Sequence, residues 1–180
     1  MNLTPERLYG YVPTPLGRVL VATAGSEVVG LYFDGHARTP GVRGRPAGSA
    51  ELFGQIGDEF DEYFRGARTA FDLPIRLEGT PFQMAVWTAL LEIPYGQTAS
   101  YAQIAERIGR PAAARAVGAA NGQNPISIVV PCHRLIGAGG GLTGYGWGLD
   151  RKRRLLELEG ALPGVSHEPR VRVRRARAES

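Results

Sequence analysis

The chain has 180 residues, 43% of them apolar, and a formal net charge of +4. That length suits one ordinary domain or two small ones. No run of 18 uncharged apolar residues occurs, so no membrane-spanning helix and no membrane partner are predicted. The first residues hold neither a basic region nor an apolar core, so we expect no secretory signal and a cytoplasmic location.

Positive charge is concentrated in the second half. Residues 1–78 hold eight arginines against ten acidic residues, whereas residues 79–163 hold eight basic against five acidic residues. Residues 164–180 add five arginines against two glutamates. This distribution indicates either a polyanionic partner for the second half or a solvated basic surface. Lys152 is the single lysine among the 21 basic residues.

The first third of the chain predicts an antiparallel sheet. Residues 8–12, 18–24 and 27–33 are rich in strand-forming residues and are separated by turn sequences. A surface loop rich in Gly, Pro and Arg is expected over 34–48.

A helix is predicted next, over about residues 50–65, with Ser49 as its cap and its acidic side chains facing water. Its apolar stripe consists of Leu52, Phe53, Ile56, Phe60, Tyr63 and Phe64. A last strand is expected over 70–77, and residues 78–81 are predicted to link the two halves.

From Thr80 onward the pattern is mostly helical. Thr80 is a predicted cap, Pro81 occupies the first helical position, and Phe82, Val86, Leu90 and Leu91 are expected to share a face. A helix over 101–108, capped by Ser100, and a helix over 112–122 follow. Their separation by Gly109, Arg110 and Pro111 resembles a helix-turn-helix.

The remaining elements are a strand-like run over 126–130, a glycine-rich loop over 137–148 and a last helix over about 150–159. The part of that loop from 139 to 148 contains six glycines but lacks the Gly-Lys-Ser/Thr ending of a phosphate loop. Tyr145 and Trp147 in this loop are expected either to stack on a base or to pack inside the protein.

The helix over 112–122 has one long side chain, Arg115, among very small ones. Small side chains let a helix approach another surface closely. That surface is either a second helix or a DNA minor groove, which is only about 6 Å wide. In a groove, Arg115 would enter the base stack as a wedge.

Cys132 is the single cysteine, so an internal disulfide and a zinc site of two or more cysteines are excluded. A free cysteine is often only a small buried hydrophobe. Here, however, Pro131 precedes it, and His133 and Arg134 follow it. In an extended segment, adjacent side chains point to opposite faces, so a water or a local bend would have to connect the thiol with the imidazole.

A carboxylate is expected to orient the His133 ring. Glu157 and Glu159 are both candidates, and the pattern alone does not choose between them.

These motifs together resemble the O6-alkylguanine-DNA alkyltransferase family. The similarity covers residues 80–160 and, more loosely, 1–79. It is carried by Pro131-Cys132-His133-Arg134 after an aliphatic run, and by Tyr101, the segment 114–118, Asn124-Pro125, Gly144-Tyr145 and the segment 155–160.

The resemblance implies an α/β, ribonuclease-H-like N-terminal domain with an antiparallel sheet and a helix over residues 1–79. It implies a mostly α-helical domain with a helix-turn-helix and the alkyl acceptor over residues 80–163. Residues 164–180 have no counterpart in the family pattern and are expected to be a disordered basic tail.

The resemblance also implies a single-turnover repair of O6-alkylguanine in double-stranded DNA bound through its minor groove, with O4-alkylthymine as a second candidate substrate. Cys132 would accept the alkyl group, His133 would deprotonate it through a water, and Glu159 would hold His133. Tyr101 would assist the leaving guanine.

Further residues are implied at two surfaces. The DNA-binding set is Arg115, Ala114, Ala116, Gly118 and Asn121, and the base-pocket set is Tyr101, Asn124, Leu135, Tyr145, Gly146 and Trp147. Asn124 would also brace the turn before the acceptor. The expected protein is a monomer without a cofactor or metal, because the zinc site of some members needs cysteines that this chain lacks.

Two other function classes fit parts of the pattern. An alkyltransferase-like damage binder would keep the fold and the Arg finger but would lack the nucleophile, and Cys132 argues against it. A cysteine hydrolase would need direct Cys–His contact and an oxyanion hole, and it would turn over many times.

Overall fold

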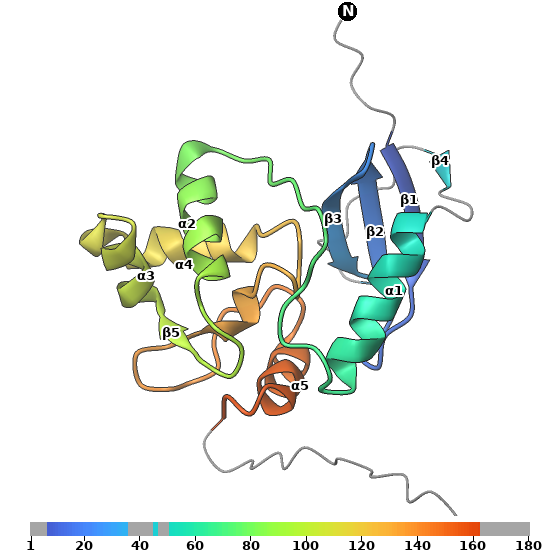
Figure 1. The fold of residues 1–180 in the computed structure, drawn as a ribbon. Coiled ribbons are helices and arrows are strands. Elements are labelled where there is room, and N and C mark those ends of the chain that lie inside the picture. The colour runs from blue at the N-terminus through green and yellow to red at the C-terminus, as the bar shows by residue number, and fades with distance from the viewer. Residues whose placement is uncertain (1–6, 36–44, 47–50, 163–180) are drawn as a thin grey trace, which may run out of the picture.

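The computed structural model describes residues 7–35, 45–46 and 51–162. Its N-terminal half is built on a sheet of β1 (Arg7–Val12), β2 (Val19–Ala24), β3 (Glu27–Phe33) and the short β4 (Arg45–Pro46). The strand order is β3-β2-β1-β4 (Figure 1). The strand β2 pairs antiparallel with both β1 and β3, and β4 pairs in parallel with β1. The predicted meander is confirmed, and β4 lies inside the segment that was predicted to be loop.

The helix α1 (Glu51–Phe64) packs on this sheet, as Figure 1 shows. Ile56, Phe60 and Tyr63 are fully buried, which confirms the centre of the predicted stripe. Gly10 on β1 allows the close approach, because a Cβ there would lie 2.7 Å from a ring carbon of Phe53. The expected cap, Ser49, lies outside the described residues.

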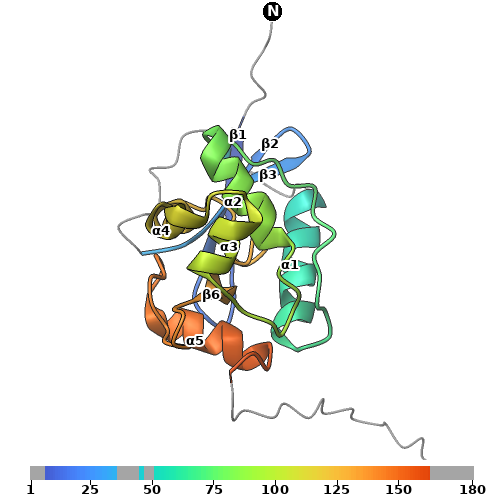
Figure 2. The same ribbon diagram turned by 90° about the vertical axis from the view of Figure 1, so that its left-hand side faces the viewer.

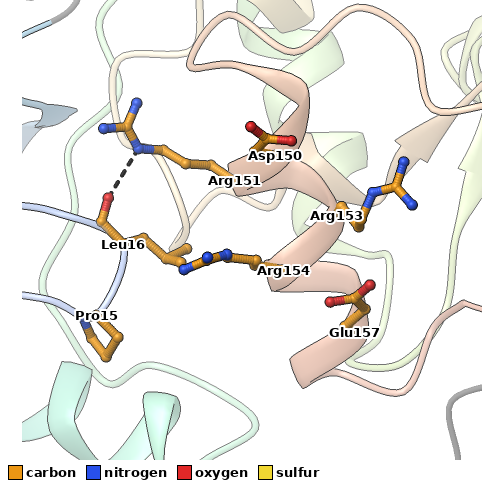
Figure 3. Close-up of a pocket in the computed structure, with 7 residues that line it drawn as sticks. All are labelled: Pro15, Leu16, Asp150, Arg151, Arg153, Arg154 and Glu157. Carbon is orange, nitrogen blue, oxygen red and sulfur yellow. Dashed lines mark hydrogen bonds between the residues drawn. The ribbon is translucent and has the colours of Figure 1, made fainter.

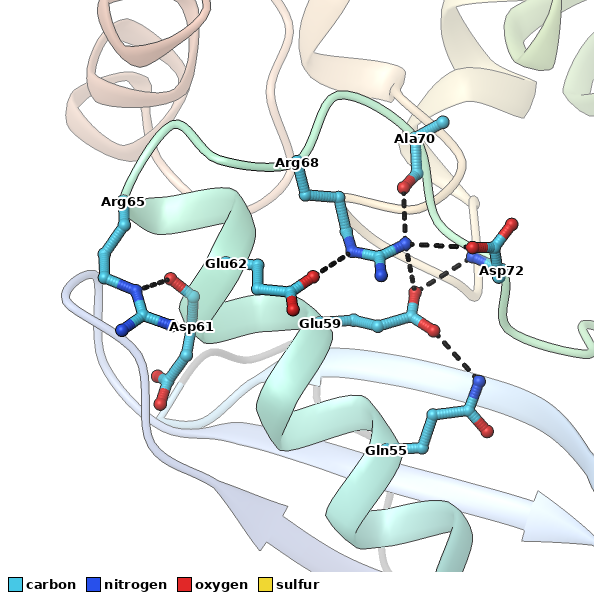
Figure 4. A network of polar contacts seen from close by, with 8 residues as sticks. All are labelled: Gln55, Glu59, Asp61, Glu62, Arg65, Arg68, Ala70 and Asp72. Carbon is cyan, nitrogen blue, oxygen red and sulfur yellow. Dashed lines mark hydrogen bonds and ion pairs between the residues drawn. The ribbon is translucent and has the colours of Figure 1, made fainter. Parts of the chain in front are cut away.

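The prediction that the acids of this helix face water is wrong for Glu59, which is 4% exposed. Its carboxylate accepts hydrogen bonds from Gln55 Nε2 and from the backbone N–H of Asp72, both at 2.9 Å, and it pairs with Arg68 at 3.3 Å (Figure 4). A buried carboxylate is tolerated when it is paired in this way. Glu59 therefore fastens the segment after α1 to the helix.

The strand expected over 70–77 is also wrong. This segment forms one isolated bridge, between Ile75 and Val28, with the Val28 N–H donating to Pro74 O and the Arg76 N–H donating to Val28 O. Pro74 has no N–H to extend a ladder. Leu73 is buried, and Phe71, Ile75 and Leu77 pack half-buried against the core.

The second half begins with α2 (Pro81–Leu91) and α3 (Tyr101–Arg107). Both have the capping box predicted by their first residues, Thr80 with Gln83 and Ser100 with Gln103. Leu91 departs from its predicted face and is 44% exposed. The buried stripe of α2 instead consists of Val86, Trp87, Ala89 and Leu90.

A 3-10 turn, Pro111–Ala113, precedes α4 (Ala114–Gly122), so the α-helix starts two residues later than expected. The helices α3 and α4 form the predicted helix-turn-helix and pack on each other, and α4 also packs on α2. Figure 2 shows these three helices together, with α5 (Leu149–Leu158) below them.

The strand expected over 126–130 is a compact turn. The described bridges here join Ser127 to Val130 and Ile126 to Leu31 of β3. Ile128, with φ +74°, adopts the left-handed region, which a β-branched residue rarely occupies. Since Ile128 is 1% exposed, tight packing around its side chain holds this conformation.

The two halves share one continuous apolar core. It runs from Val12 and Phe33 in the sheet, through Tyr63 of α1, to Ile126 and Leu155 in the second half. None of the helices in the described part of the chain is long and apolar enough to cross a membrane.

Candidate active site

Cys132 lies in a 3-10 turn, Cys132–Arg134, and not in an extended segment. The backbone is therefore bent here, but no hydrogen bond joins the thiol directly to the imidazole among the described residues. The turn is followed by β6 (Leu135–Ile136), which pairs in parallel with β5 (Ala99–Ser100). Cys132 is 2% exposed.

Two asparagine side chains donate hydrogen bonds to backbone carbonyls at and just before Cys132. Asn124 Nδ2 donates to Val130 O at 2.9 Å, and Asn124 Oδ1 accepts from the Ile126 N–H at 3.0 Å. Asn121 Nδ2 donates to Cys132 O at 3.4 Å. Asn124 therefore spans the turn as the resemblance implied. Asn121 is 2% exposed and points into the protein, away from the outer face where DNA contact was expected.

The imidazole of His133 contacts Glu159, which settles the choice that the sequence left open. His133 Nε2 lies 2.8 Å from Glu159 Oε1, and both side chains are fully buried. Glu157 instead lines a surface pocket. Burial would raise the pKa of Glu159, but His133 and Arg134 outweigh it and hold that pKa at about 2. Glu159 is therefore ionised at neutral pH.

An ionised Glu159 fixes the tautomer of neutral His133. Nε2 carries the hydrogen and donates to the carboxylate, so Nδ1 is a free acceptor. That Nδ1 atom is buried and has no hydrogen-bond partner among the described residues. Burial also lowers the pKa of His133, against the opposing effect of Glu159, which favours the neutral ring as a proton acceptor.

Arg134 and Tyr63 complete the surroundings of Glu159, and the sequence reasoning did not find them as site residues. Arg134 donates through Nε to Oε2 at 2.8 Å and through Nη2 to Oε1 at 3.0 Å. Tyr63, from α1, donates its hydroxyl to Oε1 at 2.6 Å. No local pattern signals Tyr63, which lies 96 residues from Glu159.

Burial raises the pKa of the Cys132 thiol to about 11. The Asn124 side chain and the charge of Lys152 act in the opposite direction. Thiol and imidazole are thus both neutral at neutral pH, and thiolate formation needs a nearby base.

Lys152 is a third residue near the site that the sequence motifs did not reveal. Its side chain is fully buried, and Nζ donates to Leu135 O and, at 2.6 Å, to Thr143 O. Burial lowers its pKa to about 8, whereas the Cys132 charge raises it. A sole lysine among arginines was the available signal, because a compact ammonium fits where a guanidinium does not.

The glycine-rich loop meets Tyr101. The Tyr101 hydroxyl donates to Thr143 O at 3.1 Å. A Cβ on Gly144 would lie 2.6 Å from that hydroxyl, and Gly144 has φ +62°, so both space and backbone require glycine here. Tyr145 is buried, and a contact with the Cys132 side chain is among the causes that raise the pKa of its hydroxyl. A charge on Cys132 raises the pKa of Tyr145, after the larger effect of burial, so the two groups are close.

The ring of Trp147, which the resemblance assigned to the base pocket, contacts the N-terminal sheet. Its ring is 5% exposed and packs on Tyr32 and Phe33 of β3, at centroid distances of 6.0 and 6.2 Å. Burying a large aromatic surface in the shared core is favourable. Trp147 therefore anchors the loop to the N-terminal sheet. Gly146, beside it, is half-buried.

The helix α4 presents two different faces. Val117 and Ala120 are buried against the core, whereas Arg115, Ala116 and Ala119 are exposed. Ala114 and Gly118 are half-buried at the boundary between these faces. One side of the small-residue helix thus packs on protein, and the other side leaves Arg115 on an open surface of very small residues.

A pocket of about 440 Å³ lies between α5 and the turn after β1 (Figure 3). Figure 3 shows Arg151 reaching Leu16, with Arg153 and Arg154 along the same helix. None of the predicted site residues lines this pocket. Among the described residues, no three His, Cys, Asp or Glu side chains are grouped as a metal site requires.

Comparison with known proteins identifies the family. Residues 8–77 match the ribonuclease-like domain of 6-O-methylguanine DNA methyltransferase, and residues 81–161 match its DNA binding domain. The Mycobacterium tuberculosis methylated-DNA–protein-cysteine methyltransferase is 50% identical over 151 residues, which are 84% of this chain and 91% of that protein. The Haemophilus influenzae protein of the same name is 42% identical over 84% of this chain and 85% of its own length.

A crystal structure of Mycobacterium tuberculosis OGT in complex with DNA has a TM-score of 0.80 at 49% identity, covering 86% of this chain and 93% of that chain. The fold class expected from the sequence, a ribonuclease-like part followed by a DNA-binding part, is confirmed by these matches. The chain therefore belongs to the 6-O-methylguanine DNA methyltransferase family.

Proposed function

We propose that this protein repairs DNA by moving one alkyl group, mainly methyl, from O6 of guanine to the sulfur of its own Cys132. The observation that carries this proposal is the buried thiol next in sequence to an imidazole whose Nε2 is engaged by Glu159 and whose Nδ1 is free. Family membership supports the reaction type.

The thiol proton of Cys132 moves to His133 Nδ1 through an intervening water. A water is needed because, among the described residues, no hydrogen bond joins the Cys132 thiol to the His133 ring. The thiolate attacks the alkyl carbon, a sulfur–carbon bond forms and the carbon–O6 bond breaks. The electron pair stays on the guanine, which takes up a proton. The thioether is stable to water, so each protein molecule reacts once.

Charge on the leaving guanine needs a donor close to Cys132. The Tyr101 hydroxyl is suited to this role: burial is the main cause of its raised pKa, and a charge on Cys132 raises that pKa further. In the structure this hydroxyl donates to Thr143 O, and it would exchange that partner for the purine.

We assign DNA contact to the exposed face of α4. O6 is buried in the duplex, so the base must leave the stack at a cost of about a few kcal/mol. Arg115 stands alone on a face of alanines that fits a narrow minor groove, and its side chain would fill the gap. The DNA-bound relative supports a DNA partner. We expect the protein to be a cytoplasmic monomer. Its two domains are proposed to span residues 1–79 and 80–163.

Intact mass measurement after incubation with O6-methylguanine duplex tests the proposal. The native chain should gain one methyl group, located on Cys132. Cys132→Ser should gain none but should keep its DNA affinity. Binding without any gain in the native chain would indicate a damage sensor, and repeated turnover would indicate a hydrolase.

A further inference from the structure

Tyr63 connects the N-terminal half to the chemistry of the second half. It lies on α1, is fully buried, and donates its hydroxyl to Glu159 Oε1 at 2.6 Å. Its ring is fixed by aromatic contacts with Phe64, Phe71 and Tyr95, at centroid distances of 5.3, 5.1 and 6.1 Å. The hydroxyl is therefore held in one place by the packing of its own ring.

The oxygen that Tyr63 contacts is the one that faces His133. Oε1 accepts from Tyr63, from His133 Nε2 at 2.8 Å and from Arg134 Nη2 at 3.0 Å, whereas Oε2 accepts from Arg134 Nε. Hydrogen bonds to the charged form of a carboxylate lower its proton affinity. Each donor at Oε1 thus weakens the pull of this oxygen on the proton of His133.

We propose that Tyr63 is a positioning residue of the proton relay: its hydroxyl holds Glu159 Oε1 and keeps His133 neutral, and so able to accept the thiol proton, at working pH. The inference rests on the proposed alkyl transfer to Cys132. Through Tyr63, the N-terminal half would contribute to the reactivity of Cys132, although Tyr63 itself does not touch the substrate.

The sign of the effect follows from the hydroxyl dipole. Its positive end points at Oε1, beside Nε2, and disfavours the imidazolium form of His133. Arg134 and Lys152 disfavour that form in the same way, whereas Glu159 favours it. Tyr95 and Tyr145 also lie within the field of Glu159. Removing the Tyr63 hydroxyl while keeping its ring should therefore raise the pKa of His133.

Tyr95 offers a matched control. Its ring meets that of Tyr63 edge to face and lies under the Arg134 guanidinium, but its hydroxyl donates to Leu158 O at 3.1 Å and not to Glu159. Tyr95→Phe removes a hydroxyl from the same cluster without removing a donor from the carboxylate.

The test is the rate of Cys132 alkylation against pH, with iodoacetamide and with O6-methylguanine duplex, for the native chain, Tyr63→Phe and Tyr95→Phe. The rate should rise with pH as His133 becomes neutral. In Tyr63→Phe this rise should move to higher pH, by less than about one unit because the hydroxyl acts on His133 only through the Glu159 carboxylate. Tyr95→Phe should match the native chain.

A second variant keeps the test decisive if Tyr63→Phe folds poorly. Site-specific 3-fluorotyrosine at position 63 retains the shape and makes the hydroxyl a stronger donor, so the rise should move to lower pH. A purely structural role predicts no movement in either variant. Unmoved profiles, or movement in the reverse directions, would overturn the inference. A native chain that gains no methyl from the duplex would instead overturn the proposed function.

Discussion

Replacing Glu159 by Gln should strongly destabilise the protein. The carboxylate accepts four hydrogen bonds and faces the buried guanidinium of Arg134. Its pKa is about 2, against an ordinary value of 4.5, and each pH unit of difference corresponds to about 1.4 kcal/mol. The ionised form thus contributes roughly 3 kcal/mol, in line with the roughly 3–5 kcal/mol lost when one partner of a buried pair is removed.

The pH dependence has a definite sign. Because the folded-state pKa is depressed, the contribution of Glu159 is complete above about pH 4.5 and is lost as the pH falls through about 2. The native chain should lose roughly 3 kcal/mol of unfolding free energy from this group over that window. The Glu159→Gln variant should lack this part of the acid sensitivity. Its unfolding free energy at pH 7 should be lower than that of the native chain by a similar amount.

Urea denaturation followed by tryptophan fluorescence measures this effect, because Trp87 and Trp147 are both buried. Glu157→Gln is the matched control, since Glu157 lies two residues away and lines the surface pocket. Equal unfolding free energies for the two variants would refute the assigned role of Glu159 in the buried cluster.

Three further results are expected. Arg115→Ala should slow methyl transfer from duplex DNA far more than from free O6-methylguanine, because only the duplex requires base flipping, and equal losses would make Arg115 structural. Lys152→Met removes a positive charge that lowers the pKa of Cys132, so the pH of half-maximal iodoacetamide reaction should rise, and an unchanged profile would contradict this. Trp147→Gly should lower the unfolding free energy by about 3–5 kcal/mol in urea denaturation and leave the ratio of methyl to benzyl transfer rates unaltered. A changed ratio with native stability would instead support the predicted place of Trp147 in the base pocket.

The sequence predicted those parts of the site whose signal is local. Pro131 to Arg134 form a contiguous motif, and the cap residues Thr80 and Ser100 mark helix starts that the structure confirms. The carboxylate partner of His133 could be narrowed to Glu157 or Glu159, because the pattern alone does not choose between them.

The contacts that the sequence did not reveal are long-range. Tyr63 resembles any other aromatic residue of an amphipathic stripe, and only the folded chain brings its hydroxyl to Glu159. The segments 70–77 and 126–130 have strand-like composition, but the first forms a single bridge and the second forms a turn. Composition reports strand propensity, and it does not report whether a neighbouring strand is available to pair with the segment.

The single lysine, Lys152, offers a chemical label that should distinguish alkylated from unreacted protein. The Lys152 amine is enclosed by the carbonyls of Leu135 and Thr143, so an amine-reactive reagent should leave it unlabelled while the loop is in place. Alkylation adds volume at Cys132, which is 2% exposed, and an extra methylene in a packed interior costs roughly 1–3 kcal/mol. If this crowding displaces the glycine-rich loop over 137–148, the Lys152 amine becomes exposed. The fraction of protein labelled at Lys152 would then equal the fraction alkylated at Cys132 in a mixed sample.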